Sequence, residues 1–218
     1  MGIFDIMGPV MIGPSSSHTA GPVKIANIAR LIFNNKILTA DIYFHGSFAE
    51  TYSGHGTDRA VVGGLLGYSP DDKRIKKSLK IAKDKNIEIN FHKIKLRNTH
   101  PNTILIKLKN NSKKLSIQGS SVGGGNIIIH KINNYKVNIS AKFPTLWILH
   151  KDKPGIVGKV TSNLGEYNIN IAYMQLCRKH RGKTASSIIE LDHQVSDSIL
   201  RDLENKEGIQ KIRFIPAL

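Results

Sequence analysis

Hydrophobic positions in the first two thirds of the chain repeat with both helical and strand periods. Behind a cluster of Ser and Thr, apolar residues between Ile25 and Ile32 fall on one helical face, and Thr57–Leu66 predicts a second apolar helix. Alternating or short apolar runs predict strands at Thr39–Phe48, Ile87–Ile94, Thr103–Lys109, Leu115–Ser120 and Ile127–Ile132. We therefore expect an α+β domain over residues 1–142, without an internal repeat.

The pattern changes after Pro144 and predicts elements in the order βαββαβ. The strands are Thr145–His150, Asn168–Cys177, Ala185–Asp192 and Ile209–Ile215, and the helices are Ile156–Tyr167 and Ser196–Asn205, the second capped by Ser196 or Asp197. This order is typical of a small ferredoxin-like sandwich. Residues 143–218 are therefore predicted to form a second domain, so the fold class of the whole chain is α+β.

The composition is that of an ordinary globular protein. The 218 residues suit one large or two small domains, and 40% of them are hydrophobic. The longest apolar runs stay far below the roughly 18–20 residues that cross a bilayer. Met1–Val10 lacks the basic segment and long apolar stretch of a signal peptide. We expect a cytoplasmic protein that does not enter a membrane.

Charge and cysteine content narrow the function classes. A net charge of +16 suggests nucleic acid, but the basic residues are spread out and only 6% of residues are aromatic. The densest basic run, Lys73–Lys85, is typical of a solvated helix face. An acidic partner or an anionic substrate is favoured over nucleic acid. The single cysteine, Cys177, excludes an internal disulfide and an iron–sulfur cluster held by this chain alone.

The first candidate site is the segment Ser15-Ser16-Ser17-His18-Thr19, which precedes a predicted helix with Pro22 in its first turn. Unpaired N–H groups and a partial positive charge at a helix N-terminus attract carboxylate or phosphate groups, and hydroxyls add further donors. Plain N-capping needs one hydroxyl, whereas this segment has four and a histidine. An anion site is therefore favoured over a simple cap.

Two further histidines lie in predicted turns. His55 stands between two glycines and is followed by Thr57 and Asp58, either of which can cap the next helix. Pro101 keeps His100 out of helical geometry. Because histidine titrates near pH 6.5, both are candidate proton carriers, and a solvated loop histidine is the alternative for each.

A last candidate is the loop Gly123-Gly124-Gly125 between two strands, which is either an anion nest or a plain turn. Other chemistries have less support. A hydrolase triad lacks the Gly-x-Ser-x-Gly elbow, and a metal site built from His18, His55 and His100 lacks a helical i, i+4 pair or a cysteine partner.

Together these segments resemble a known family. Phe4-Asp5, followed by Ile12-Gly13-Pro14-Ser15-Ser16-Ser17-His18-Thr19-Ala20-Gly21-Pro22, closely resembles the opening of bacterial iron–sulfur L-serine dehydratases. The family's Gly-His-Gly-Thr-Asp, His-x-Asn and Ser-x-Gly-Gly-Gly elements follow here in the same order. The resemblance covers roughly Met1–Ile132 and is to the family's beta domain, which is related in fold to the allosteric substrate-binding domain of some phosphoglycerate dehydrogenases.

Phe143–Leu218 resembles an ACT domain, through Leu149–Val157, Leu164-Gly165-Glu166 and Asn168–Ile171. ACT domains commonly bind a free amino acid at a subunit interface, in the loop before their first helix. The resemblance therefore implies Asp152, Gly155 and Ile156 as effector-binding residues, a small amino acid such as serine as the effector, and a dimer through the ACT and beta domains.

The resemblance also implies a reaction, the deamination of L-serine to pyruvate and ammonia. The family's 4Fe–4S cluster is carried by an alpha domain that is absent here, so a separate alpha subunit is the expected partner. The cluster would act as a Lewis acid on the serine hydroxyl while a base removes the Cα proton. By the match, His55, His100 and His18 are the catalytic candidates, and the substrate-binding candidates are Ser15, Ser16, Ser17, Thr19, Thr57, Asp58, Gly123, Gly124 and Gly125. The alternatives are a stand-alone amino-acid-sensing module without catalysis and a basic regulatory protein that binds nucleic acid.

Overall fold

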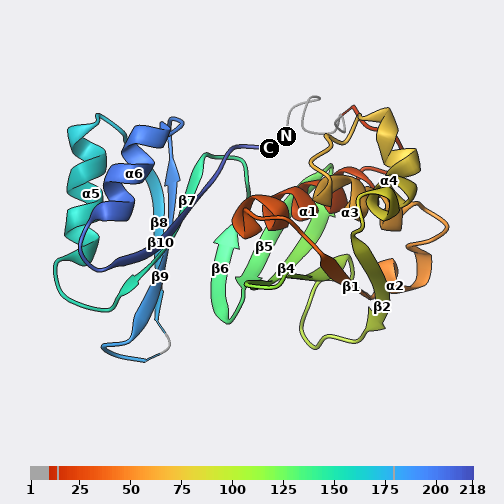
Figure 1. The fold of residues 1–218 in the computed structure, drawn as a ribbon, viewed down its shortest axis with the longest axis horizontal. Coiled ribbons are helices and arrows are strands. Elements are labelled where there is room, and N and C mark those ends of the chain that lie inside the picture. The colour runs from red at the N-terminus through yellow and green to blue at the C-terminus, as the bar shows by residue number, and fades with distance from the viewer. Residues whose placement is uncertain (1–9, 14, 179) are drawn as a thin grey trace. The chain divides into compact units, whose positions relative to one another are not determined.

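A computed structural model describes residues 10–13, 15–178 and 180–218, and the chain forms two compact units, residues 1–133 and 134–218 (Figure 1). The expectations that involve Phe4, Asp5 and Pro14, and the expectation for Met1–Val10 as a segment, lie outside the described residues. The division precedes the boundary expected after residue 142, because β6 (Tyr135–Ile139) groups with the second unit. None of the described helices is both long and apolar enough to span a membrane.

The first unit is a layer of helices on one face of a mixed sheet. Within this unit the strands have the order β2-β1-β3-β4-β5, with β1 (Thr39–His45), β2 (Glu88–Ile94), β3 (Thr103–Lys109), β4 (Lys114–Gly123) and β5 (Asn126–Ile132). The helices are α1 (Ala20–Phe33), α2 (Ser47–Thr51), α3 (Thr57–Leu65), the 3₁₀ helix η2 (Lys73–Lys77) and α4 (Ser78–Asp84). β1 is parallel to β2. The pairs β1–β3, β3–β4 and β4–β5 are antiparallel.

The predicted apolar face of α1 is buried as expected. Ile25, Ile28 and Ile32 are fully buried, and α1 packs against β3, β4 and β5. α1 also packs along α3 at Gly64, where a Cβ atom would overlap the Val23 carbonyl oxygen and lie 2.7 Å from the Ala26 Cβ. A glycine is therefore required for the two helices to approach this closely.

The strand register brings the predicted site segments to one edge of this sheet. His45, at the end of β1, pairs with Thr103, at the start of β3, and Thr103 pairs with Ser120 near the end of β4. Gly123 and Asn126 close the β4–β5 hairpin at the same edge. The N-terminus of α1 reaches this edge too, because Gly21 lies against Ser121: a Cβ on Gly21 would lie 2.6 Å from the Ser121 Cβ.

Some elements differ from the sequence prediction. The first strand ends at His45 and not at Phe48, because Gly46 has φ +58° and approaches Pro101 so closely that a Cβ there would lie 2.5 Å from the Pro101 carbonyl oxygen. The chain then forms α2, which was not predicted, and β6 was also missed. The basic run Lys73–Lys85 forms η2 and α4, which confirms its prediction as a helix face.

The second unit has the predicted βαββαβ order. Its elements are β7 (Thr145–Lys151), α5 (Ile156–Glu166), β8 (Ile171–Arg178), β9 (Thr184–Leu191), α6 (Asp197–Asn205) and β10 (Ile209–Ile215), with sheet order β10-β7-β9-β8. Both helices cover one face of this sheet (Figure 1), and the core between them includes Leu146, Leu164 and Leu203. Ser196 caps α6, since its Oγ accepts a hydrogen bond from the Ile199 N–H at 3.4 Å.

Candidate active site

Two of the predicted histidines are in direct contact. The rings of His18 and His55 meet edge to face, with centroids 4.9 Å apart and an interplanar angle of 89°. His18 lies in the turn before α1, and His55 lies just before α3. The close packing of α1 against α3 therefore places two sequence motifs side by side that are far apart in the chain.

His18 is held in a half-buried position. Its ring lies edge-on to Phe48 of α2, at 5.1 Å between centroids, and its Nδ1 lies 3.3 Å from the Ser15 Oγ. Burial, and secondly the neighbouring His55, lower the pKa of His18 below its ordinary 6.5. His18 is therefore neutral at pH 7 and able to accept a proton, whereas the His55 side chain is exposed to solvent.

A cavity of about 490 Å³ opens beside His55. It is lined by Met11, Ile12, Gly13, Thr19, Gly54, His55, Gly56, Arg59, Ile75 and Lys76. It thus joins the hydroxyl-rich segment, through Thr19, to the Gly-His-Gly turn. Its volume falls in the usual range for a small-molecule site, about 300–1,000 Å³.

Sequence reasoning missed the two cations of this cavity, Arg59 and Lys76. Arg59 follows the Gly-His-Gly-Thr-Asp motif directly, and Lys76 belongs to the basic run on η2. Proximity to the motif was the only signal for Arg59, and nothing in the sequence separates Lys76 from its neighbours. Two positive side chains in a cavity with a histidine suit a ligand that carries a carboxylate.

The start of α1 offers fewer free backbone donors to an anion than expected. The N–H groups of Thr19 and Gly21 already donate to the carbonyls of Ser15 and Ser16, at 2.9 and 3.1 Å. No side chain caps the helix. Within the described residues, the hydroxyls of Ser16 and Ser17 make no hydrogen bond. These hydroxyls, more than backbone N–H groups, remain available to a ligand.

The start of α3 differs from its prediction as well. Its N-cap is Gly56, with φ +70°, so the expectation that Thr57 or Asp58 caps this helix is wrong. Thr57 is fully buried, and its Oγ1 has no hydrogen-bond partner. Asp58 Oδ1 accepts from the Arg59 N–H at 2.7 Å, and burial raises the pKa of Asp58 against the opposing effect of this hydrogen bond.

His100 lies at the same sheet edge but outside the cavity lining. Its Nδ1 accepts from the Asn102 N–H at 3.1 Å, so in the neutral ring Nε2 carries the hydrogen. Its carbonyl accepts from the Thr103 hydroxyl at 2.6 Å, and Thr103 and Ser120 share a hydrogen bond of 2.6 Å. Ser120 in turn lies 2.8 Å from the Nε2 of His130.

This chain of hydrogen bonds gives a role to His130, which sequence reasoning missed. The bonds cross from β3 to β4 to β5, and such pairing is invisible without the register. Burial is the main cause that lowers the pKa of His130, and the nearby His100 and Lys131 lower it further. A neutral His130 can hydrogen-bond to Ser120, which bonds to Thr103, and Thr103 donates to the His100 carbonyl. This chain of bonds supports the loop that carries His100.

Unpaired polar atoms gather at this edge. The buried atoms without a hydrogen-bond partner include His18 Nε2, Thr57 Oγ1, Asn102 Oδ1 and Ser121 Oγ. Buried polar groups are nearly always paired, with protein, water or ligand. Their concentration where the motifs converge is the expected signature of a site for a polar ligand.

The glycine loop has a structural explanation. Gly124 and Gly125 have φ of +58° and +75°, as a two-residue hairpin turn requires, and Gly123 has φ +100°. All three lie outside the cavity lining. A plain turn accounts for these glycines, and their substrate-binding role stays a prediction.

The predicted effector residues are partly engaged within the second unit. Asp152 Oδ2 accepts from the Gly182 N–H at 2.8 Å and from Arg178 at 3.2 Å; the first bond, followed by Arg178, lowers the pKa of Asp152. Ile156 is buried against Gly208. Gly155, with φ +82°, begins α5 without a side-chain cap and is exposed. Effector binding by these residues stays a prediction.

The described residues do not form a metal centre. No group of three or more His, Cys, Asp or Glu is close enough to hold an ion in the part of the chain that the structure describes. Cys177 lies half-buried on β8. One thiolate does not fit an iron–sulfur cluster, which normally takes three or four.

Comparison with known proteins matches both units. The family model described as serine dehydratase beta chain matches residues 2–132, and the ACT domain model matches residues 146–208. The chain is 41% identical over 213 residues to a probable L-serine dehydratase beta chain of Bacillus subtilis (strain 168), covering 98% of this chain and 97% of the relative. It is 38% identical to the L-serine dehydratase beta chain of Peptoniphilus asaccharolyticus, covering 97% and 96%. A D-3-phosphoglycerate dehydrogenase of Methanocaldococcus jannaschii is 30% identical over 62% of this chain and 25% of its own length.

Proposed function

The chain belongs to the serine dehydratase beta chain family, and we propose that it is the subunit of a two-chain L-serine dehydratase that binds serine and moves its protons. The observation that carries the proposal is the contact between His18 and His55 beside a cavity that also holds two cations. The products would be pyruvate and ammonia.

The cavity offers partners for the carboxylate of serine. Arg59 and Lys76 line it and suit the carboxylate, and the uncommitted hydroxyls of Ser16 and Ser17 stand at the start of α1 to add hydrogen bonds. The serine carboxylate is desolvated when it binds, and it needs charged or hydrogen-bonding partners because an unpaired charge is costly to bury.

The two histidines form the proton-accepting pair. Two imidazolium rings with centroids 4.9 Å apart would repel each other, which together with burial favours the neutral form of His18. With His18 kept neutral by burial, the pair accepts the Cα proton of serine, and the exposed His55 passes it to solvent. Loss of the β-hydroxyl as water then gives aminoacrylate, which tautomerises and hydrolyses to pyruvate and ammonia. The leaving hydroxide becomes water by taking up a proton from solvent, where His55 releases the Cα proton, and His100, with its hydrogen on Nε2, is the candidate hydrogen-bond donor to the leaving hydroxyl.

The proposed iron–sulfur cluster belongs to a separate alpha subunit. The described residues of this chain do not fit such a cluster, so no step of the chemistry above is assigned to it. The net charge of +16 suits an acidic partner surface.

The ACT domain is proposed to bind a small amino acid, with serine as the first candidate. Support comes from the ACT family match and from the uncapped start of α5 at Gly155. Calorimetry with serine on a chain carrying Ser16→Ala and Ser17→Ala, which weakens the first site, tests it. Heat that disappears when Gly155→Val is added supports the proposal, and the absence of heat contradicts it.

Reconstitution tests the proposed function. The chain alone is expected to be colourless and inactive with serine. Mixed anaerobically with a cysteine-containing alpha chain, iron and sulfide, it is expected to form a brown complex that releases pyruvate. Iron–sulfur absorbance or serine turnover by the isolated chain would contradict the division between two subunits.

A further inference from the structure

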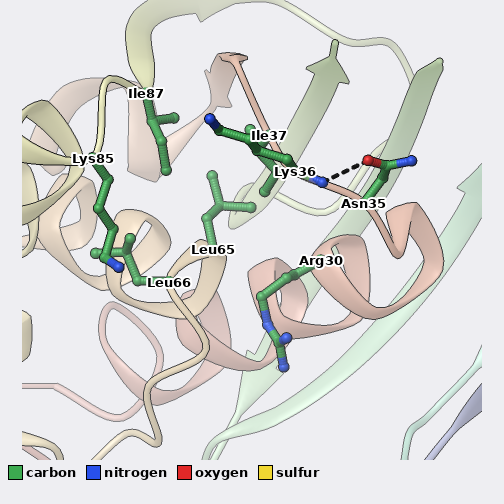
Figure 2. A pocket seen from close by; sticks show the side chains of 8 residues that line it. All are labelled: Arg30, Asn35, Lys36, Ile37, Leu65, Leu66, Lys85 and Ile87. Atoms are coloured by element: carbon green, nitrogen blue, oxygen red, sulfur yellow. Dashed lines mark hydrogen bonds between the residues drawn. The ribbon is translucent and has the colours of Figure 1, made fainter. Parts of the chain in front are cut away.

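A second cavity, of about 400 Å³, lies at the far end of the first unit's sheet from the candidate active site. It is lined by Arg30, Asn35, Lys36, Ile37, Leu65, Leu66, Lys85 and Ile87 (Figure 2). Ile87 directly precedes β2 and Ile37 lies two residues before the parallel strand β1, whereas the candidate active site lies at the opposite end of β1. The two cavities are therefore separate sites.

The cavity combines an apolar floor with a basic rim. Ile37 and Leu65 are almost fully buried, and Leu66 and Ile87 are half-buried. The cations come from three segments, and Figure 2 shows Leu65 between Arg30, Lys36 and Lys85. A ligand that fits here has an aliphatic part and a negative charge.

The positive charges lack a protein partner. None of the eight lining residues is acidic. Among the described residues, no salt bridge joins Arg30, Lys36 or Lys85 to an acidic side chain. Arg30 Nε is buried without any hydrogen-bond partner, and the guanidinium lies over Gly67, where a Cβ would meet Nε at 3.2 Å. A buried N–H without a partner is costly, and Arg30 as a whole is half-buried, so the remainder of its guanidinium carries a positive charge that an anion can pair with.

Helix ends explain only part of this arrangement. α1, α3 and α4 all end near the cavity, and cations near a helix C-terminus are favourable. That effect accounts for basic residues near the ends of α1 and α4, such as Arg30 in the last turn of α1. It does not account for the buried, unpaired Nε or for the apolar floor.

We propose that this cavity binds a small aliphatic carboxylate, of about four to six carbons for a site of this size. The carboxylate pairs with Arg30 and with a rim lysine, and the alkyl chain packs on Ile37 and Leu65. The site is independent of the proposed reaction. It lies at the C-terminal ends of α1 and α3. Thr19 and Thr57 stand at the N-terminal ends of these helices, and the two ends of α1 are about 20 Å apart.

Calorimetry on the full chain tests the proposal, with isovalerate as the probe. Isovalerate is expected to bind, and both inorganic phosphate and 3-methylbutanol are expected to bind at least about tenfold more weakly, since each lacks one half of the ligand. Lys85→Met is expected to weaken isovalerate binding about two- to fivefold, as for an exposed ion pair. Arg30→Met is expected to weaken it about tenfold or more.

Lys83→Met is the matched control. Lys83 is exposed in the last turn of the same helix end but does not line the cavity, so its loss is expected to leave the affinity unchanged. No heat with isovalerate, or equal affinity for the Lys83→Met and Lys85→Met chains, would overturn the proposal. Phosphate binding as tightly as isovalerate would overturn the ligand class. If Arg30→Met fails to fold, the exposed Lys85 still provides the test.

Discussion

Gly64 is the residue whose replacement most directly tests how the candidate active site is built. A Cβ at Gly64 would overlap the Val23 carbonyl oxygen and lie 2.7 Å from the Ala26 Cβ, whereas ordinary contacts begin at 3.4 Å. Gly64→Ala must therefore push α3 from α1 by about 0.7 Å or more. Overpacking of this kind destabilises by about 1–3 kcal/mol, and the better helix propensity of Ala offsets about 0.5–1 kcal/mol of that.

We expect the Gly64→Ala chain to be less stable by about 1–2 kcal/mol, which lowers the melting temperature of the first unit by about 5 °C. Because α1 and α3 carry His18 and His55, the same displacement disturbs the histidine pair. A misplacement near 1 Å can lower a rate about 10²-fold, so serine turnover in the reconstituted complex is expected to fall even at temperatures where the chain is folded.

The assay is thermal unfolding followed by far-UV circular dichroism, with Gly158→Ala as the control. Gly158 lies in α5 with no atom within 4 Å of the added Cβ, so the same substitution is expected to stabilise by about 0.5–1 kcal/mol. Fluorescence of Trp147, the only tryptophan, follows the second unit separately. A Gly64→Ala chain that melts at or above the wild-type temperature would refute the close-packing argument.

Further substitutions test the separate parts of the site. The double substitution Ser16→Ala and Ser17→Ala is expected to raise KM for serine and to leave kcat nearly unchanged, because the lost hydroxyls would bind the substrate and the transition state equally. Steady-state kinetics measures both constants, and a fall in kcat alone would contradict this expectation. The pKa of His18 is lower in the folded chain than its unfolded value near 6.5, so the stability that comes from a neutral His18 is present above about pH 6.5 and is lost as pH falls below it. The urea midpoints of unfolding at pH 7.5 and 5.5 are therefore expected to differ less in the His18→Gln chain than in the wild type. An equal difference in both chains would exclude His18 as the cause. His130→Ala is expected to lower kcat at constant KM, because the loop that carries His100 loses a hydrogen-bonded support. His130→Gln is expected to restore part of kcat. An unchanged kcat in both variants would show that His130 does not position His100.

The sequence predicted the regular parts of the fold well, for a physical reason. The alternation within Thr39–His45 and the apolar face from Ile25 to Ile32 reflect burial, which the periodicity records directly. The five-residue helix α2 left no such record, because it is short and its position depends on the tight contact of Gly46 with Pro101.

The candidate site was predictable residue by residue but not as an arrangement. Composition and resemblance singled out His18 and His55, yet their contact follows from the packing of α1 on α3. The cations Arg59 and Lys76 enter the cavity through tertiary packing, and the role of His130 depends on strand register. Such pairings between distant segments have no periodicity that a single sequence can display.

The histidine pair of this chain is proposed to move the protons of serine. The most direct measurement is pyruvate release by the reconstituted two-chain complex, with the wild-type chain, with His55→Asn and with Lys83→Met as a surface control. We expect the His55→Asn chain to form the same complex but to lose about 10²–10⁴-fold in kcat, while Lys83→Met behaves as wild type. A His55→Asn complex that turns over serine at the wild-type rate would contradict it.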